Sequence, residues 1–228
     1  MPPVRPPFSD VVDAVREQTA LLLGLTISYS DEDWAAATSL TGWSRSHVAA
    51  HLAEGARGMV RVIRSLHSGI PRRMYDSEAA NQRAIELGAL ADGLDLQIRL
   101  DTSASELQAE LAALEDDDRL VSLRAGYQVP AHDIPLARLS EVVLHHVDMG
   151  CILEESDLVP GIAEALLAFH VERIGHRDDY PPLRLVADEE YIGSVGRPGA
   201  TTGMHGPSAD LLVWLTRGIE TPRLYRAE

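Results

Sequence analysis

The sequence predicts an α+β chain, with an N-terminal helical bundle over residues 1–153 and a small α/β domain over residues 154–228. Two observations predict this division. Apolar residues recur at three- and four-residue spacing through most of the first part, as they do in amphipathic helices. Beyond Gly150, short strand-like runs and glycine turns replace that pattern. The chain has 228 residues, of which 45% are hydrophobic, and this is enough material for a core in each part.

Two long helices are predicted at the start of the bundle. Residues 8–28 place valine and leucine at helical spacing. Residues 44–68 do the same, with Ser44 or Ser46 as the cap of the first turn and Gly69 at the end. A serine at this position accepts a hydrogen bond from a backbone N–H that the helix leaves unpaired, and glycine readily adopts the left-handed conformation that follows a helix.

Two shorter helices and a final long one complete the predicted bundle. The shorter helices are expected over residues 77–91 and 103–116. The acidic run at residues 115–118 is interpreted as a solvated helix end, because it lacks the alternating ligands of a calcium loop. After a loop over residues 126–135, the last helix reaches residue 151.

The C-terminal domain is predicted to mix helices with short strands. A helix is expected near residues 161–174, strands at residues 183–186 and 191–195, and a closing amphipathic helix at residues 207–217. The glycine-rich stretch before the closing helix lacks the spacing of dinucleotide-binding or Walker motifs. A nucleotide site is therefore not expected.

Composition excludes several function classes. The net charge of −15 argues against binding nucleic acid, because that binding depends on basic contacts to phosphate. All 20 basic residues are arginine, so no lysine can form a Schiff base or serve in a P-loop. No apolar run approaches the ~20 residues of a membrane span, and the N-terminus lacks the apolar core of a secretory signal. We therefore expect a cytoplasmic protein, whose single cysteine, Cys151, is a packed apolar residue.

The last helix of the predicted bundle has a polar stripe on an otherwise apolar surface. Arg138, Glu141, His145 and Asp148 follow one another at three- and four-residue spacing and therefore share one helix face. A buried carboxylate and imidazole are costly unless they are paired or bound to a metal. An apolar helix upstream contains His51, so two histidines and a glutamate could bind one divalent ion. Three protein ligands and an open position are typical of a catalytic zinc site.

Alternatives for these residues remain open. Glu141 and His145 could form an intrahelical pair with Arg138 as counter-ion, and His51 could be a hydrogen-bonded core residue. Two imidazoles and a carboxylate suit zinc, but they also describe the facial triad of iron(II) enzymes, and spacing does not separate the two metals.

Two neighbouring residues are expected to support the site. Asp148 follows His145 by one turn and is well placed to accept a hydrogen bond that orients a ligand imidazole. His47 precedes His51 by one turn and could line the same pocket or simply sit near the start of its helix.

The residues around the candidate ligands resemble a known family. The segments GWSRSHVAAHLA and EVVLHHVDMG are similar to the paired signatures of the mycothiol-dependent maleylpyruvate isomerase family. The segments MYDSEAANQRAIELGA, YQVPAHDIPLARLSEV and LVWLTRG resemble other parts of the same family, so the similarity spans the chain. The resemblance implies a DinB-like four-helix bundle at the N-terminus and zinc ligands at His51, Glu141 and His145.

The same resemblance implies roles for further residues. Arg217 falls on an arginine associated with activity in the family, and it would pair with a substrate carboxylate. Asn81 and Arg138 are the residues expected to bind the cofactor, mycothiol. The chain departs from the family at one position: Ala80 replaces the family arginine that comes just before the asparagine, here Asn81. The identity of the substrate is therefore left open.

The resemblance implies a zinc-dependent and mycothiol-dependent cis-trans isomerase. A metal-bound thiolate would add to an activated double bond, allow rotation about the resulting single bond, and leave again. Three alternatives remain: a mycothiol S-transferase that consumes the thiol, a metalloenzyme without thiol chemistry, and a non-catalytic binding bundle with a structural metal. The expected partners are a small thiol and a small electrophile, with no nucleic acid or membrane, and the protein is expected to be a monomer or homodimer.

Overall fold

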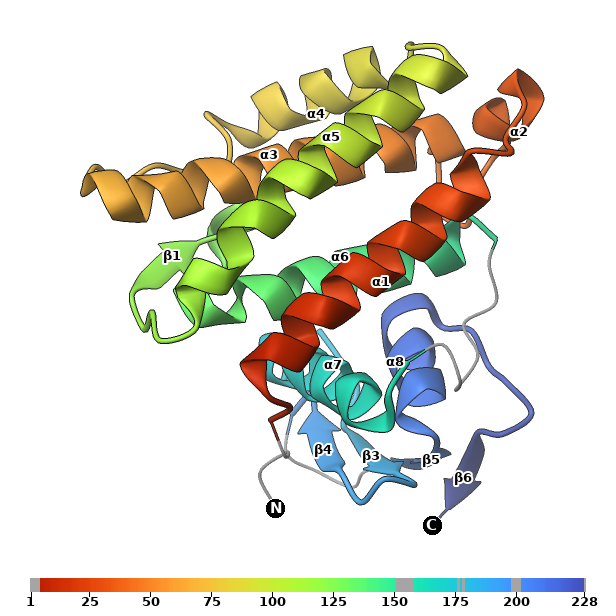
Figure 1. Cartoon of the computed structure of the whole chain (residues 1–228). Coiled ribbons are helices and arrows are strands. Elements are labelled where there is room, and N and C mark those ends of the chain that lie inside the picture. Colours follow the sequence, from red (N-terminus) through yellow and green to blue (C-terminus); the bar gives the residue numbers. More distant parts are fainter. Residues whose placement is uncertain (1–4, 151–157, 176, 178, 198–201, 228) are drawn as a thin grey trace. The chain divides into compact units, whose positions relative to one another are not determined.

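The computed structural model describes residues 5–150, 158–175, 177, 179–197 and 202–227, and the chain divides into two compact units (Figure 1). One unit is Phe8–Ile152; the other is Leu153–Glu228 together with Met1–Pro7. The first is helical apart from a short hairpin, and the second combines helices with a sheet. The predicted fold class is confirmed. Cys151 lies outside the described residues.

The N-terminal unit is a bundle built around one long central helix, α3. Helix α3 packs against α4, α5 and α6, while α1 packs against α5 and α6. Figure 1 shows α3 in orange with α4 alongside it in yellow. The helices of this unit are α1 Phe8–Thr26, α2 Asp31–Ala35, α3 Arg45–Ser68, α4 Glu78–Gly88, α5 Gly93–Leu111 and α6 Ile134–Asp148.

The ends of α3 are those that the sequence predicts. Ser44 is the N-cap, and its hydroxyl and backbone N–H both contact Nδ1 of His47, at 2.8 and 3.2 Å. Gly69 follows the last turn with a φ of +69°, the left-handed conformation that glycine adopts without steric cost. His47 therefore lies in the first turn of the helix, and its ring also stacks on Trp43 with centroids 6.3 Å apart.

Two helical features differ from the prediction. Helix α5 begins at Gly93, ten residues earlier than expected, because Asp92 caps it by accepting a hydrogen bond from the backbone N–H of Asp95 at 2.8 Å. The short helix α2 was not predicted. Ser30 and Asp33 form a capping box at its start, and Trp34 on α2 is buried.

A small hairpin replaces part of the predicted loop before α6. Strand β1, Leu120–Ser122, pairs antiparallel with β2, Gln128–Pro130, and the two buried residues Val121 and Val129 face each other across the pair. Strands of three residues leave too short an alternation to be recognised in the sequence.

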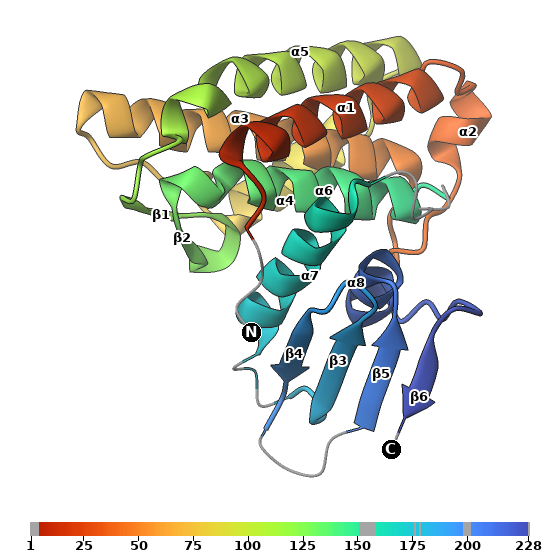
Figure 2. The same cartoon turned by 60° about the horizontal axis from the view of Figure 1, so that its bottom comes forward.

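The C-terminal unit is a four-stranded sheet with two helices, α7 Pro160–Ile174 and α8 Ser208–Arg217 (Figure 2). The strand order is β4-β3-β5-β6; β3 and β5 are parallel and the other neighbours are antiparallel. Helices α7 and α8 pack against each other; α7 also contacts β4, and α8 contacts β3 and β5. The strands are β3 Leu183–Ala187, β4 Ile192–Val195, β5 Thr202–Gly206 and β6 Tyr225–Ala227.

The helices and the first two strands of this unit lie where the sequence predicts them, whereas β5 and β6 were missed. Strand β5 contains two glycines, and β6 has only three residues, two of them exposed. Neither shows the alternation of apolar and polar residues that identifies a strand.

Among the described residues, no helix combines the length and the hydropathy that crossing a membrane would require.

Candidate metal centre

His51, Glu141 and His145 come together in the N-terminal unit, as the sequence predicts. His51 lies on α3, and the other two lie one turn apart on α6. One potential ligand atom from each residue can be chosen so that all three lie within 4.8 Å of one another. The His51 and His145 rings meet edge to face with their centroids 4.8 Å apart. These distances allow all three side chains to bind a single ion.

Glu141 is paired across helices and not within its own helix. His51 Nε2 donates a hydrogen bond to Glu141 Oε2 at 2.9 Å. Burial alone would raise the pKa of the Glu141 carboxyl. The hydrogen bond from His51, with electrostatic contributions from His51, His145 and Arg138, instead holds this pKa below its ordinary value. Glu141 is therefore an ionised carboxylate, the form that binds a metal.

The second ring nitrogen of His51 distinguishes this residue from a core histidine whose two nitrogens are both hydrogen-bonded. His51 is 2% exposed, and its buried Nδ1 has no hydrogen-bond partner in the described structure. An unpaired buried polar atom costs about 1–3 kcal/mol. Among the described residues, His51 is therefore hydrogen-bonded through one ring nitrogen only.

His145 is oriented by Asp148, the supporting role that the sequence predicts for this aspartate. His145 Nδ1 donates to Asp148 Oδ2 at 2.7 Å, and Ser39 Oγ donates to Asp148 Oδ1 at 2.9 Å. Burial lowers the pKa of the His145 imidazole, and the hydrogen bond to Asp148 opposes this shift without reversing it. A neutral imidazole with its proton on Nδ1 has a free lone pair on Nε2 for a metal.

Arg138 lies near Glu141 and is almost completely buried. Its Nη1 donates to the backbone oxygen of Leu52 on α3 at 2.9 Å. Burial lowers the pKa of this guanidinium, and the negative charge of Glu141 opposes that effect. Because an arginine pKa starts so high, the group keeps its positive charge next to the carboxylate.

Two aromatic residues of the site were not identified from the sequence. The Trp43 ring lies against His51, with centroids 5.4 Å apart. The half-buried Tyr75, in the segment between α3 and α4, has a raised pKa because of burial and the nearby charge of Glu141. Both lie outside the predicted helices, so helical periodicity could not place them on the face that carries His51.

Comparison with known families agrees with this geometry. The family described as the mycothiol maleylpyruvate isomerase N-terminal domain matches residues 15–150. That range covers more than half of the chain and includes all three candidate ligands. The chain belongs to this family.

Solved structures show the same fold over nearly all of the chain. A crystal structure of the mycothiol-dependent maleylpyruvate isomerase has a TM-score of 0.86 and 20% sequence identity, covering 97% of this chain and 93% of that chain. A histidine-to-alanine mutant of that enzyme gives the same TM-score and coverage at 19% identity. Comparison with curated proteins gives no significant match.

Within this family member, the residues assigned from the resemblance occupy different environments. Asn81 lies on α4, is 3% exposed, and its Oδ1 has no hydrogen-bond partner in the described structure. Its neighbour Ala80 is exposed. Arg217 is the last residue of α8 in the C-terminal unit, where its Nη1 donates to the Thr216 carbonyl oxygen at 3.2 Å. Asn81 and Arg138 lie in the same unit as the three candidate metal ligands, whereas Arg217 lies in the other unit.

The donor set fits a divalent metal. Two imidazoles and one ionised carboxylate suit zinc and related ions, and a cation bound by His51 and Glu141 would replace the proton that they share. The buried Nδ1 of His51 has no hydrogen-bond partner in the described structure, so this imidazole retains an unused polar atom at the centre. The cluster His51, Glu141 and His145 is therefore the candidate metal centre of this family member.

Proposed function

We propose that this protein is a zinc-dependent enzyme that uses a low-molecular-weight thiol, mycothiol, to isomerise an activated double bond, as a maleylpyruvate isomerase does. The observation that carries the proposal is the meeting of His51, Glu141 and His145 in a family named for that reaction. A zinc ion with an open coordination position lowers the pKa of a bound thiol and keeps it as a nucleophilic thiolate at neutral pH.

In this proposal the protein supplies metal ligands and anion-binding groups, and the sulfur comes from the cofactor. Arg138 keeps a positive charge beside the metal ligands, and it binds mycothiol together with the buried amide of Asn81. Arg217 pairs with a carboxylate of the substrate, for which a planar guanidinium with two parallel N–H groups is suited. No cysteine nucleophile of the protein is required.

The experiment that tests the isomerase proposal follows the fate of the thiol. Purified protein, zinc and mycothiol are incubated with maleylpyruvate; loss of the cis-enol absorbance is followed, and free thiol is titrated at the end. We expect isomerisation with all of the thiol recovered, because addition and elimination return it. Omitting mycothiol or zinc should abolish the reaction, and persistence of full activity without either would contradict the proposal.

One observation favours a second candidate, a mycothiol S-transferase. Ala80 stands where the family resemblance leads us to expect an arginine, and an exposed methyl group cannot hold a carboxylate. A transferase would consume one thiol for each electrophile. In the same assay, no reaction with maleylpyruvate together with thiol consumption by another electrophile would decide for the transferase.

We further propose that the protein works in the cytoplasm as a monomer or homodimer, with the boundary between its two domains at residues 153 and 154. The division of the chain into two compact units at a neighbouring residue supports this boundary.

A further inference from the structure

Three polar atoms, two from α6 and one from the segment between α3 and α4, lie close to Gly55 of α3. A Cβ atom at this position would lie 3.8 Å from Arg138 Nη1, 3.9 Å from Glu141 Oε2 and 3.9 Å from Tyr75 Oη. Glu141 Oε2 is the oxygen that accepts the hydrogen bond from His51. The Tyr75 hydroxyl therefore lies at the candidate metal centre, beside the space that the missing side chain of Gly55 leaves.

A second glycine on the same helix allows Tyr75 to approach. A Cβ at Gly58 would lie 3.2 Å from Tyr75 Cε1 and from Met74 Cβ and Cε, closer than ordinary van der Waals contact. Glycine in a helix interior costs about 1 kcal/mol relative to alanine. Met74 is 4% exposed and anchors the segment against α3. Gly58 therefore lowers the stability of the helix, but because it has no side chain the Tyr75 ring can pack against α3 next to the candidate metal centre.

The Tyr75 hydroxyl has hydrogen-bonding capacity that the described protein does not use. In the described part of the chain, no hydrogen bond to Tyr75 Oη is found, although the ring is half-buried and two polar side chains are close. A phenol is protonated at neutral pH and can donate one hydrogen bond. Glu141 already accepts from His51, and a metal would occupy this carboxylate further.

We propose that Tyr75 is a specificity-determining residue: its hydroxyl donates a hydrogen bond to a carboxylate or carbonyl oxygen of the molecule held at the metal, in the space left by Gly55. The inference rests on the proposed function, because it requires a ligand at this centre. It adds a recognition group that lies in the same unit as the metal ligands and that is independent of Arg217.

The test compares two thiols that differ only in an acceptor group. Cobalt-substituted protein is titrated with 1-propanethiol and with 3-mercaptopropionate, and binding is read from the visible spectrum of the cobalt ion. Tyr75→Phe should weaken 3-mercaptopropionate binding roughly tenfold, the value of a hydrogen bond to a charged group, and leave 1-propanethiol within about twofold. Gly55→Ala should also lower the preference for 3-mercaptopropionate, because its methyl group fills the space for the carboxylate.

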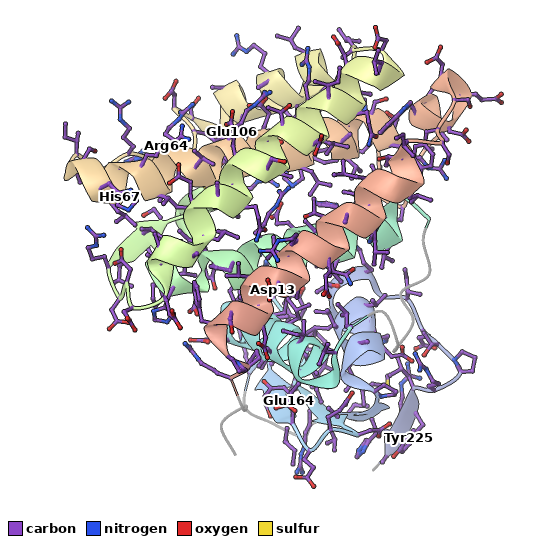
Figure 3. The ribbon with its side chains drawn as sticks, viewed as in Figure 1. Asp13, Arg64, His67, Glu106, Glu164 and Tyr225 are labelled. Atoms are coloured by element: carbon purple, nitrogen blue, oxygen red, sulfur yellow. The ribbon has the colours of Figure 1, made fainter. Side chains whose placement is uncertain are left out.

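Tyr225→Phe is the matched control, since Tyr225 is 56% exposed on β6 of the other unit (Figure 3). If the wild type binds both thiols and Tyr75→Phe leaves the ratio of the two affinities unchanged, the proposed function stands while the role of Tyr75 is overturned. Equal weakening of both thiols, or loss of cobalt, would also overturn it, because Tyr75 would then support Glu141. A wild-type spectrum that responds to neither thiol would overturn the proposed function itself.

Discussion

His51 combines deep burial with an incomplete set of hydrogen bonds, and this combination separates it from an ordinary core histidine. One nitrogen donates to Glu141 and the other has no partner in the described structure. His145 is different, because Asp148 fixes its proton on Nδ1 and leaves Nε2 free. The two histidines are therefore oriented differently. Asp148, on the same helix, orients His145, whereas the candidate ligand Glu141, on the facing helix, orients His51.

Removing any one ligand should empty the metal centre while the fold remains. We expect His51→Ala, Glu141→Ala and His145→Ala each to lower the metal content from about one ion per chain to roughly a tenth or less, because a site with two protein ligands holds zinc poorly. Metal analysis of the purified proteins measures this, and circular dichroism checks the fold.

His67→Ala is the matched control for the ligand variants. His67 lies on the same helix as His51 but is exposed near its C-terminal end (Figure 3). This variant should keep the wild-type metal content. Stoichiometric metal in all three ligand variants would refute the assignment of the centre.

Asp148 should affect the metal only through His145. Asp148→Asn keeps the shape of the side chain but removes the charge that orients the imidazole, so we expect metal affinity to fall by about 10- to 100-fold. Competition with a chelator of known affinity measures the change. Ser39→Ala, which removes only the hydrogen bond to the other oxygen of Asp148, should have a smaller effect. An affinity of Asp148→Asn equal to that of wild type would show that the contact is only structural.

At the scale of elements, glycines decide how closely the helices of the bundle approach one another. A Cβ at Gly93, the first residue of α5, would lie 2.7 Å from two atoms of the Trp34 ring on α2. Trp34 is 3% exposed and belongs to a core cluster that also contains Leu96 of α5. Its ring has little room to move, so the start of α5 requires glycine for packing.

Gly93→Ala should therefore lower the free energy of unfolding by about 1–3 kcal/mol, the usual cost of overpacking. Gly24→Ala provides the opposite control: Gly24 lies within α1 with no atom near its Cβ position, so alanine should add about 0.5–1 kcal/mol through helix propensity. Urea denaturation of both variants measures the two changes. Stabilisation by Gly93→Ala would show that the Trp34 ring moves aside freely.

The same scale shows which elements the sequence could predict. Helix α3 could be predicted closely because its cap, its apolar face and its terminal glycine agree. The start of α5 was predicted ten residues late, although Asp92 is a good cap and Leu96 and Leu100 continue the buried face, because two glycines and two aspartates near this start suggest a linker. The loop-like composition therefore masked a start that the Asp92 cap and the buried leucines of α5 determine.

The candidate site could be predicted only in part for a related reason. His51, Glu141 and His145 lie on regular helices, where spacing determines the face on which each residue lies. Tyr75 and Trp43 lie in connecting segments that have no period. The only signal for Tyr75 was the pair Gly55 and Gly58 on the same face of the helix as His51, which indicates that another segment approaches closely there.

At the scale of the whole molecule, Arg217 is the predicted site residue that lies in the C-terminal unit. We expect Arg217→Ala to keep metal and fold but lose most of kcat/KM on the true substrate. Arg217→Lys should recover little, because lysine cannot form two parallel hydrogen bonds to a carboxylate. Arg226→Ala is the control: this exposed arginine of the same unit pairs with Glu220 at the surface. Wild-type kcat/KM in Arg217→Ala would contradict the role in substrate binding. Arg217 would then only stabilise the C-terminal end of α8 through the helix dipole.

The hydrogen bond between His51 and Glu141 joins positions 90 residues apart in the chain. Contacts of such long range form slowly during folding, because the intervening chain must first be ordered. An ion captured by these two residues would act as a removable cross-link between α3 and α6, and it would stabilise the folded state by mass action without changing the core. Chelation would then shorten the lifetime of the folded N-terminal unit as well as remove the reactive centre, so the supply of metal would set both the amount of this protein and its activity.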